Sequence, residues 1–431
     1  MRLVALSLAL ACTAEPGQEP AQEVRRPNLV LAIADDLDPG HVGFLGNPLA
    51  RTPRLDQLAA QGWLTPALYA QPVCRAALAV LLSGRWPHET GVTSNGAEAA
   101  LAAANALPAR LRAAGYASYC AGKFWEGPPP TYGFDAPAAN DERFARGGED
   151  GQAELFAFLA EQALRGPWFV WWAPSLPHTP HRPPVRFAQE FAATELAPPA
   201  GIRGSAEDFQ AAERASLAMH TWMDAEFRRL LAKLEELGEL EDTVILFLAD
   251  NGWSTWRVSK GTPREQGVCM PLIASAPGQV RHGLEAGFLA DLVDVHATLL
   301  DYAGAAPAPE DRGQSLRPHL EGRAEGGRAR LFGSAHARRG ELYALYARDQ
   351  RWKYVRYVRD VNSQELSPGP RLAEPFRRKS GVEELFDLEA DPFEQENLAR
   401  LEEHAARLAE LRAATLAWWR ATGGPELPEP R

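Results

Sequence analysis

Short apolar runs alternate with longer amphipathic segments over most of this chain. Apolar runs bounded by polar residues predict buried strands, and an apolar stripe with a 3.6-residue period predicts a helix. The predicted strands are 28–34, 117–121, 168–172, 243–249 and 271–274. The predicted helices are 53–62, 76–82, 107–114, 211–237 and 292–302. This alternation predicts the α/β class, with a mostly parallel central sheet flanked by helices.

The pattern changes near residue 326. Aromatic residues face both sides of segment 342–358, which predicts an antiparallel hairpin, and 384–388 is a further short strand. A terminal helix is predicted over 397–422. We therefore predict an α/β domain over 27–325 and a smaller C-terminal α+β lobe over 326–431 that carries an antiparallel sheet.

The first 26 residues predict export. Met1 and Arg2 precede an apolar run over 3–11, which is too short to span a membrane, and a polar tether follows. The run ending at Cys12 also resembles a bacterial lipoprotein cleavage site, in which Cys12 would carry a lipid anchor. Soluble export and lipoprotein export stay open, so the expected location is the periplasm, the outer membrane or the exterior. The alternative is a mis-set start codon or a disordered tail.

Composition narrows the classes of partner. The formal net charge is -11, and the sequence has no basic cluster, which argues against a nucleic-acid partner. Four cysteines, Cys12, Cys74, Cys120 and Cys269, are too few for a disulfide-built protein.

Hard oxygen ligands follow two of the predicted strands. Asp35 and Asp36 come after 28–34, and Asp250 and Asn251 come after 243–249. The carboxyl ends of parallel strands meet at one edge of a sheet. Such a group suits calcium or magnesium, which would offset the repulsion between carboxylates. The alternative for each pair alone is a helix cap or a turn.

Cys74 stands directly before a predicted apolar helix. A thiol at a helix N-terminus beside Arg75 should have a lowered pKa and therefore be reactive. The alternative is an inert cysteine that is buried for packing.

A series of short motifs, in order, resembles the sulfatases of the alkaline phosphatase superfamily over nearly the whole chain. Segment 52–59 resembles the family's TPNLDRLA, 176–180 its APHxP, 249–252 its SDNG and 260–267 its KGTxxEGG. The other matching segments are 26–36, 83–88, 122–123, 291–304 and 384–398.

The resemblance implies a role for each matching residue. The metal, calcium in most of the family, would be held by Asp35, Asp36, Cys74, Asp250 and Asn251. A formylglycine-installing enzyme would oxidise Cys74, and the hydrated aldehyde would attack the sulfur of a sulfated small molecule or glycan. Lys123, His178 and Lys260 would neutralise sulfate oxygens or protonate the leaving alcohol.

Two positions depart from the family pattern. Leu78 stands where the motif cysteine-x-proline/alanine-x-arginine has its arginine, unless Arg75 is matched to it by a different alignment. Trp125 and Glu126 stand where a histidine follows the family's GK motif, and a carboxylate there should repel sulfate. Losing one preorganised donor costs about 2.7–4 kcal/mol of transition-state stabilisation.

Three functions stay open on the sequence. The first is sulfate ester hydrolysis through a formylglycine at position 74. The second is a catalytically impaired relative that binds anionic glycans, and the third is phosphate or phosphonate ester hydrolysis. Trp253 and Trp256, which follow Asn251, are candidates for a pocket wall, whereas Trp171 and Trp172 are expected in the core. His88, His181 and His220 are alternative site histidines.

Overall fold

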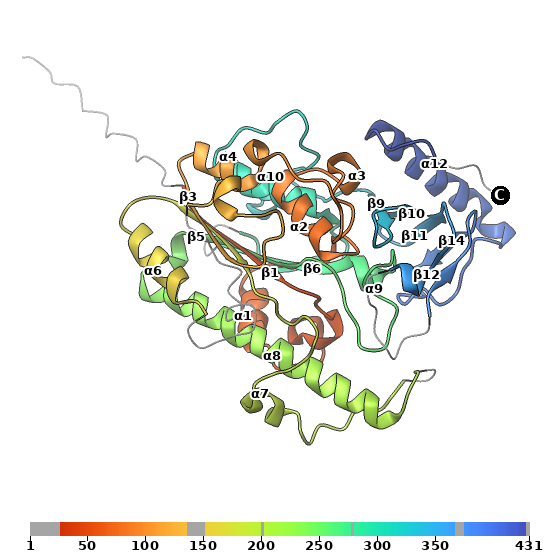
Figure 1. Ribbon diagram of the computed structural model, residues 1–431, viewed down its shortest axis with the longest axis horizontal. Helices are drawn as coiled ribbons and strands as arrows, with labels where there is room; N and C mark the ends of the chain where they lie inside the picture. The colour runs from red at the N-terminus through yellow and green to blue at the C-terminus, as the bar shows by residue number, and fades with distance from the viewer. Residues whose placement is uncertain (1–25, 136–150, 200–201, 277–279, 367–374, 428–431) are drawn as a thin grey trace, which may run out of the picture.

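The computed structural model describes residues 26–135, 151–199, 202–276, 280–366 and 375–427. The predicted signal segment and Cys12 lie outside these residues. Within them, an eight-stranded central sheet lies between two layers of helices, and a smaller sheet stands beside it (Figure 1). The described residues include no helix that combines the length and the apolar character needed to cross a membrane.

The parallel half of the central sheet contains four of the five strands that the apolar runs predicted. Strand β1 (Asn28–Ala34) is parallel to β4 (Trp168–Ala173) on one side and to β5 (Thr243–Ala249) on the other. Strand β3 (Ala117–Gly122) is parallel to β4 at the edge. These strands are buried on both faces, which explains their continuous apolar runs.

The other half of the sheet is mixed. Strand β6 (Cys269–Ser275) runs antiparallel to β5 and to β2 (Trp63–Tyr69), and short strands β7 (Gly283–Leu284) and β8 (Ala290–Asp291) pair with β2. The sequence did not predict β2. Pro66 interrupts it, and the pairing with β6 shifts register between Thr65 and Leu68.

Helices cover both faces of this sheet (Figure 1). One layer holds α2 (Cys74–Ser83), α4 (Leu107–Ala113) and α10 (Leu292–Tyr302). The opposite layer holds α1 (Pro53–Gln61), α6 (Ala153–Gln162) and α8 (Ala206–Glu236). The shorter helices are α3 (Pro87–Thr90), α7 (Val185–Glu190), α9 (Glu265–Val268) and α11 (Arg317–Leu320). Helix α8 begins five residues before the predicted start because Ser205 and Asp208 form a capping box.

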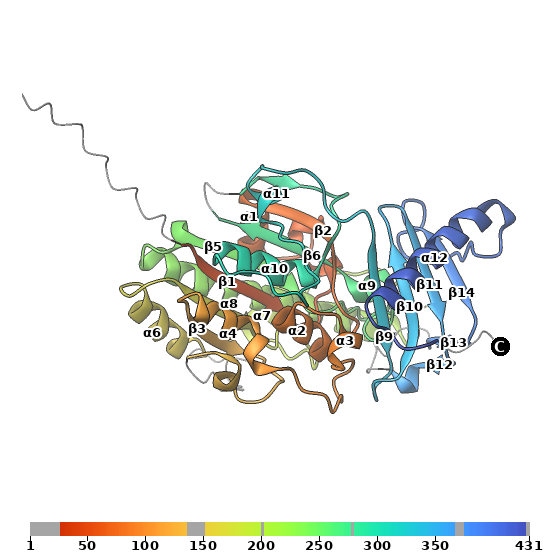
Figure 2. The same cartoon turned by 90° about the horizontal axis from the view of Figure 1, so that it is seen from above.

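The C-terminal sheet is antiparallel, as predicted. Its order is β14 (Glu383–Asp387), β11 (Trp352–Tyr357), β10 (Leu342–Arg348) and β9 (Leu331–His336). A separate pair joins β12 (Val361–Asn362) to β13 (Arg377–Arg378). Helix α12 lies along the C-terminal sheet (Figure 2). The domain boundary near residue 326 stays a prediction.

Helix α12 (Ala405–Ala421) is shorter than the predicted 397–422. The predicted start was wrong because Asn397 is tied to β14 instead. Its side chain accepts a hydrogen bond from the Leu385 amide and donates one to the Glu383 carbonyl. Leu408 and Leu411 of α12 pack against Leu385.

Candidate active site

The ends of β1 and β5 meet, as their parallel register requires. Ala34 pairs with Ala249, so the residues that follow them lie side by side. The Asp36 amide donates to Asp250 Oδ1 at 3.2 Å, and Asn251 Nδ2 donates to Asp36 Oδ1 at 2.7 Å. Asp36 has a left-handed backbone, with φ of 63°, which turns the chain sharply after the strand.

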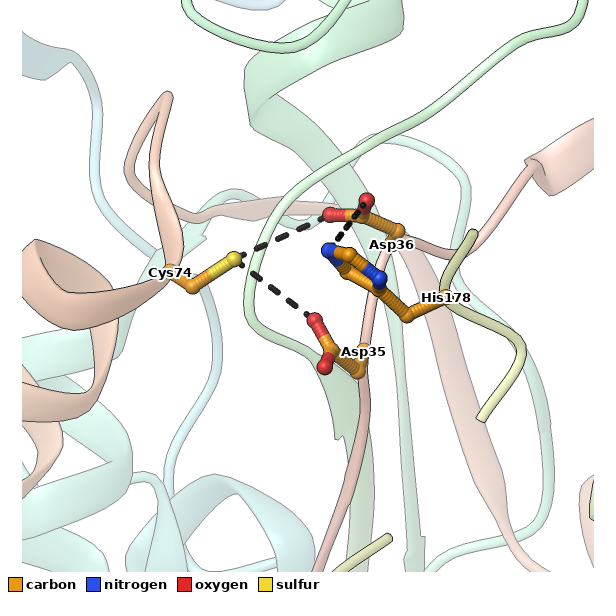
Figure 3. A group of neighbouring side chains, drawn as sticks. All are labelled: Asp35, Asp36, Cys74 and His178. Atoms are coloured by element: carbon orange, nitrogen blue, oxygen red, sulfur yellow. Dashed lines mark hydrogen bonds and ion pairs between the residues drawn. The ribbon is translucent and has the colours of Figure 1, made fainter. Parts of the chain in front are cut away.

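Cys74 faces this group from the first turn of α2 (Figure 3). Its Sγ lies 3.6 Å from Asp35 Oδ1 and 3.8 Å from Asp36 Oδ1. One potential ligand atom from each of Asp35, Asp36, Cys74 and His178 lies within 4.8 Å of all the others. Three segments that are distant in the sequence therefore converge on one point.

Two buried lysines neutralise the carboxylates. Lys123 Nζ lies 2.5 Å from Asp35 Oδ1 and 2.9 Å from Asp250 Oδ2, and Lys260 Nζ lies 2.6 Å from Asp36 Oδ1. The backbone of Lys123 is fixed to β4, since its amide donates to the Ala173 carbonyl at 2.6 Å. The amide of Gly261 donates to the Pro72 carbonyl at 2.8 Å, which fixes the Lys260 loop beside Cys74.

His178 is the most exposed of these groups. Its side chain is 35% exposed, against 7% for Lys123. The preceding loop is attached to the end of β1, because the Asp35 amide donates to the Leu176 carbonyl. His178 Nδ1 contacts the Thr179 carbonyl, and Nε2 lies 3.3 Å from Lys260 Nζ. With Nδ1 directed at that carbonyl, Nε2 faces the site and lies 3.3 Å from Asp36 Oδ2.

The charges of the site shift its pKa values. Burial alone would raise the pKa of Asp35, but Lys123, His178 and Lys260 lower it to about 2. Burial alone would lower the pKa of Lys123, but Asp250 and Asp35 raise it well above its usual value. Both groups are therefore charged near neutral pH.

Two oxygens at the centre of the site lack a hydrogen bond. Among the described residues, Asp36 Oδ2 and Asn251 Oδ1 are buried without a hydrogen-bond partner, although His178 Nε2 lies 3.3 Å from Asp36 Oδ2. Buried polar atoms are rarely left unpaired. A carboxylate oxygen and an amide oxygen are the donors that calcium and magnesium take, so the residues fit a hard divalent cation.

A family model for sulfatases matches residues 27–305, which span β1, the site and α10. The chain belongs to the sulfatase family. The match begins at the strand that carries Asp35 and Asp36 and includes every predicted site residue.

Known sulfatases are similar to the chain in sequence. It is 28% identical to an N-acetylgalactosamine-6-sulfatase of Mus musculus over 66% of this chain, but this covers 64% of that protein, so the chain spans slightly less than two thirds of it. It is 24% identical to an ulvan-active sulfatase of Formosa agariphila, covering 92% of this chain and 81% of that one. It is 29% identical to arylsulfatase A of Homo sapiens, covering 87% and 83%.

Solved structures share the fold. One is a protein in complex with its substrate D-glucosamine-2-N,6-O-disulfate, with a TM-score of 0.77, 20% identity, and coverage of 92% of this chain and 98% of that one. Another is a sulfatase from Pseudoalteromonas sp., with a TM-score of 0.71, 21% identity, and coverage of 95% and 93%.

This member of the sulfatase family departs from the family pattern in the residues around Cys74. Leu78 lies on the same face of α2 as Cys74, one turn later, and packs in the hydrophobic core at 2% exposure. Arg75 points elsewhere. Its guanidinium contacts Glu126 at 2.8 Å and donates to the Ala97 and Ala99 carbonyls.

The expected low pKa of the Cys74 thiol was wrong. Burial, followed by the charge of Asp250, raises the pKa well above the ordinary value for cysteine. Lys123 and Lys260 act in the opposite direction but do not outweigh these effects. Arg75 does not lower the pKa of Cys74, because Glu126 pairs with its guanidinium and neutralises its charge.

The expected repulsion of sulfate by Glu126 was also wrong, because this carboxylate is not left without a counter-charge. Its carboxylate is buried and binds Arg75 through both oxygens, at 2.8 and 3.2 Å. Trp125 is 40% exposed, and Lys123 Nζ lies 5.6 Å from the centre of its ring. An aromatic ring therefore stands beside Lys123.

The remaining sequence candidates divide between core and surface. Trp171 and Trp172 are fully buried, as expected. Trp253 is buried too, whereas Trp256 lines a pocket. His88 binds Thr422 and packs on Trp419, and His220 accepts a hydrogen bond from the Asp38 amide, so both hold other elements in place. His181 is buried enough to lower its pKa to about 4.

Proposed function

We propose that this protein hydrolyses sulfate esters with a nucleophile made from Cys74. The observation that carries the proposal is the convergence of Cys74, three carboxylates and three cationic or protonatable groups at one sheet edge. A sulfate ester needs this balance, because the nucleophile needs activation and negative charge develops on the leaving oxygen.

We propose that Asp35, Asp36, Asp250 and Asn251, with residue 74, hold calcium or magnesium. The unpaired oxygens of Asp36 and Asn251 support this assignment. Such a cation lowers the pKa of a nucleophilic hydroxyl and offsets negative charge on sulfate. With the cation present, Lys123 and Lys260 no longer need to neutralise the carboxylates and can turn their ammonium groups toward sulfate oxygens.

We propose that an installing enzyme converts Cys74 to formylglycine. Water adds to the aldehyde to give a geminal diol, and one hydroxyl oxygen attacks sulfur while the bond from sulfur to the alcohol oxygen breaks. His178 Nε2 delivers a proton to that alcohol, since His178 is the exposed member of the group. The second hydroxyl then loses its proton, the aldehyde re-forms and sulfate leaves.

The relatives favour a sugar as the substrate. Their names include an N-acetylgalactosamine-6-sulfatase and an ulvan-active sulfatase, and one structural neighbour holds a disulfated glucosamine. We propose a sulfated glycan as the substrate class. Export, with or without a lipid anchor at Cys12, stays part of the proposal.

The test is turnover by protein co-expressed with a formylglycine-installing enzyme. We expect hydrolysis of 4-nitrophenyl sulfate and of sulfated monosaccharides, and little hydrolysis of 4-nitrophenyl phosphate. Chelation should abolish turnover and lower the melting temperature, and added calcium should restore both, because ligand binding stabilises the folded state. Faster turnover of the phosphate would favour the phosphoesterase alternative.

The binding-only alternative rests on Leu78 and Trp125, which replace two cationic positions of the family pattern. It predicts calcium-dependent binding of sulfated glycans with no release of sulfate. Sulfate release above the rate of the Cys74→Ala variant would exclude it.

A further inference from the structure

A cavity lies between the segment that follows Asn251 and residues of the C-terminal part. Its volume is about 640 Å³. Its lining includes Trp256, Arg257, Arg264, Phe376, Arg378 and Phe393. The lining therefore combines three guanidinium groups with three aromatic rings, and this combination suits an anionic ligand with a flat apolar face.

Two of the three arginines are already paired. Glu384 binds Arg264 at 3.2 Å and Arg378 at 2.6 Å. These two arginines therefore build the wall and offer little free charge.

Arg257 is different. Within the described part of the chain, its guanidinium has no carboxylate within ion-pair distance and no side-chain hydrogen bond. It is held between two rings instead, 4.2 Å from the centre of Trp256 and 3.4 Å from the centre of Phe393. Phe393 is 51% exposed. Stacking fixes the plane of the guanidinium and leaves its N–H groups available for a bidentate anion.

Residues that line the cavity are linked to the proposed catalytic residues by short stretches of chain and by hydrogen bonds. Arg257 precedes Lys260 by three residues, so their Cα atoms are at most about 11 Å apart. Gln266 also lines the cavity, and its side chain donates to Asp38 Oδ1 at 3.4 Å. Asp38 follows Asp36 by two residues in the chain. The Ser254 amide donates to Ser259 Oγ at 3.1 Å, which closes the turn between Asn251 and Lys260.

We propose that this cavity is a subsite for an anionic group on the sugar neighbouring the one that carries the reacting sulfate. Arg257 would bind the carboxylate of a uronic acid or a second sulfate, and Phe393 would pack on the sugar ring. The inference rests on the proposed function for its substrate class. It adds that the enzyme acts on an oligosaccharide and recognises a second negative charge.

The experiment measures binding, so it does not depend on turnover. In a Cys74→Ala background, isothermal titration compares tetrasaccharides of chondroitin 4-sulfate, chondroitin 6-sulfate, heparin and carrageenan with the corresponding sulfated monosaccharides. We expect at least one tetrasaccharide to bind more tightly than its monosaccharide. The substitution Arg257→Gln should reduce that advantage at least about 10-fold, the usual worth of a hydrogen bond to a charged group.

The controls separate charge from folding. Arg165→Gln removes an exposed arginine that does not line the cavity and should leave the affinity ratio unchanged. Arg257→Lys keeps the charge without the planar guanidinium. Its affinity ratio should lie between those of Arg257→Gln and Arg165→Gln. Carboxyl-reduced tetrasaccharides identify the anion: loss of the advantage points to a uronate, and its retention points to a second sulfate.

The proposal is overturned if no tetrasaccharide exceeds its monosaccharide, or if Arg257→Gln keeps the full advantage at an unchanged melting temperature. Failure of the proposed function gives a different result. In that case, protein that keeps Cys74 releases no sulfate.

Discussion

The centre and the back of this site are built on different principles. At the centre, Asp35, Asp36 and Asp250 are each matched by Lys123 or Lys260 at 2.5–2.9 Å. Elsewhere around Cys74, the sequence has Leu78 and Trp125 where the family pattern predicts cations. Leu78 packs in the hydrophobic core, and the Trp125 ring lies beside Lys123.

The difference separates residues whose charge is needed for the proposed reaction from residues that fix the packing around them. Removing a charge at the centre leaves a buried opposite charge without compensation, which is costly for both stability and catalysis. The Arg75–Glu126 pair behind it is internally neutral, so it contributes to position more than to charge. Substitutions at the centre should therefore reduce turnover far more than substitutions behind it.

The largest effect is expected at Cys74. Cys74→Ala should reduce turnover on the order of 10⁶-fold, as removal of a catalytic nucleophile does. Cys120→Ala is the matched control, because Cys120 is also fully buried but lies within β3. Steady-state assays with 4-nitrophenyl sulfate check both. Equal activity of the two variants would remove Cys74 from the mechanism.

Much of this comparison could be read from the sequence. The continuous apolar runs of β1 and β5 gave the strand ends, and parallel pairing of neighbouring strands then required Asp36 and Asp250 to meet. Strand β2 could not be read because Pro66 breaks its pattern. Strand β9 was missed because Gly333, Ser334 and Ala335 show no alternation of apolar and polar residues.

The contacts behind Cys74 could not be predicted from the sequence either. Arg75 and Glu126 are 51 residues apart, and no period or motif links them. The same holds for the pKa of Cys74. A position at the start of a helix argued for a low pKa, whereas burial and Asp250, which only the fold reveals, raise it.

The next effect in size concerns the lysines. Lys123→Met should lower kcat/KM about 10²–10³-fold, the usual cost of one electrostatic contact in a transition state. It should also make folding more dependent on calcium, because Asp35 and Asp250 lose their other positive neighbour. Melting curves with and without a chelator measure this dependence. Lys379→Met, at a side chain 79% exposed, should change neither value.

Substitutions in the buried Arg75–Glu126 pair should change the free energy of unfolding more than turnover. Glu126→Gln or Arg75→Met should each cost about 3 kcal/mol of unfolding free energy, since the remaining buried charge loses its counter-charge. The double variant should cost less than the sum of the two, as expected for residues in contact. Urea unfolding measures all three. Strict additivity would show that the pair is not coupled.

The smallest effect should be a gain. Trp125→His places a protonatable side chain beside Lys123, at one of the two positions where the family pattern predicts a histidine. We expect turnover to rise about 10-fold, below the usual range for a well-positioned acid or base because the neighbouring residues are not adapted to it. Trp125→Phe keeps an aromatic ring without the proton and should show no gain. An equal rise in both variants would mean that Trp125 only obstructs the site.

The most direct test is the chemical state of residue 74 in protein that releases sulfate. Peptide mass spectrometry of the tryptic fragment containing residue 74, after co-expression with an installing enzyme, distinguishes a thiol from an aldehyde. We expect sulfur to be lost, an aldehyde oxygen to take its place, and the converted fraction to track specific activity across preparations. A preparation that turns over sulfate esters with an intact thiol at position 74 would contradict it.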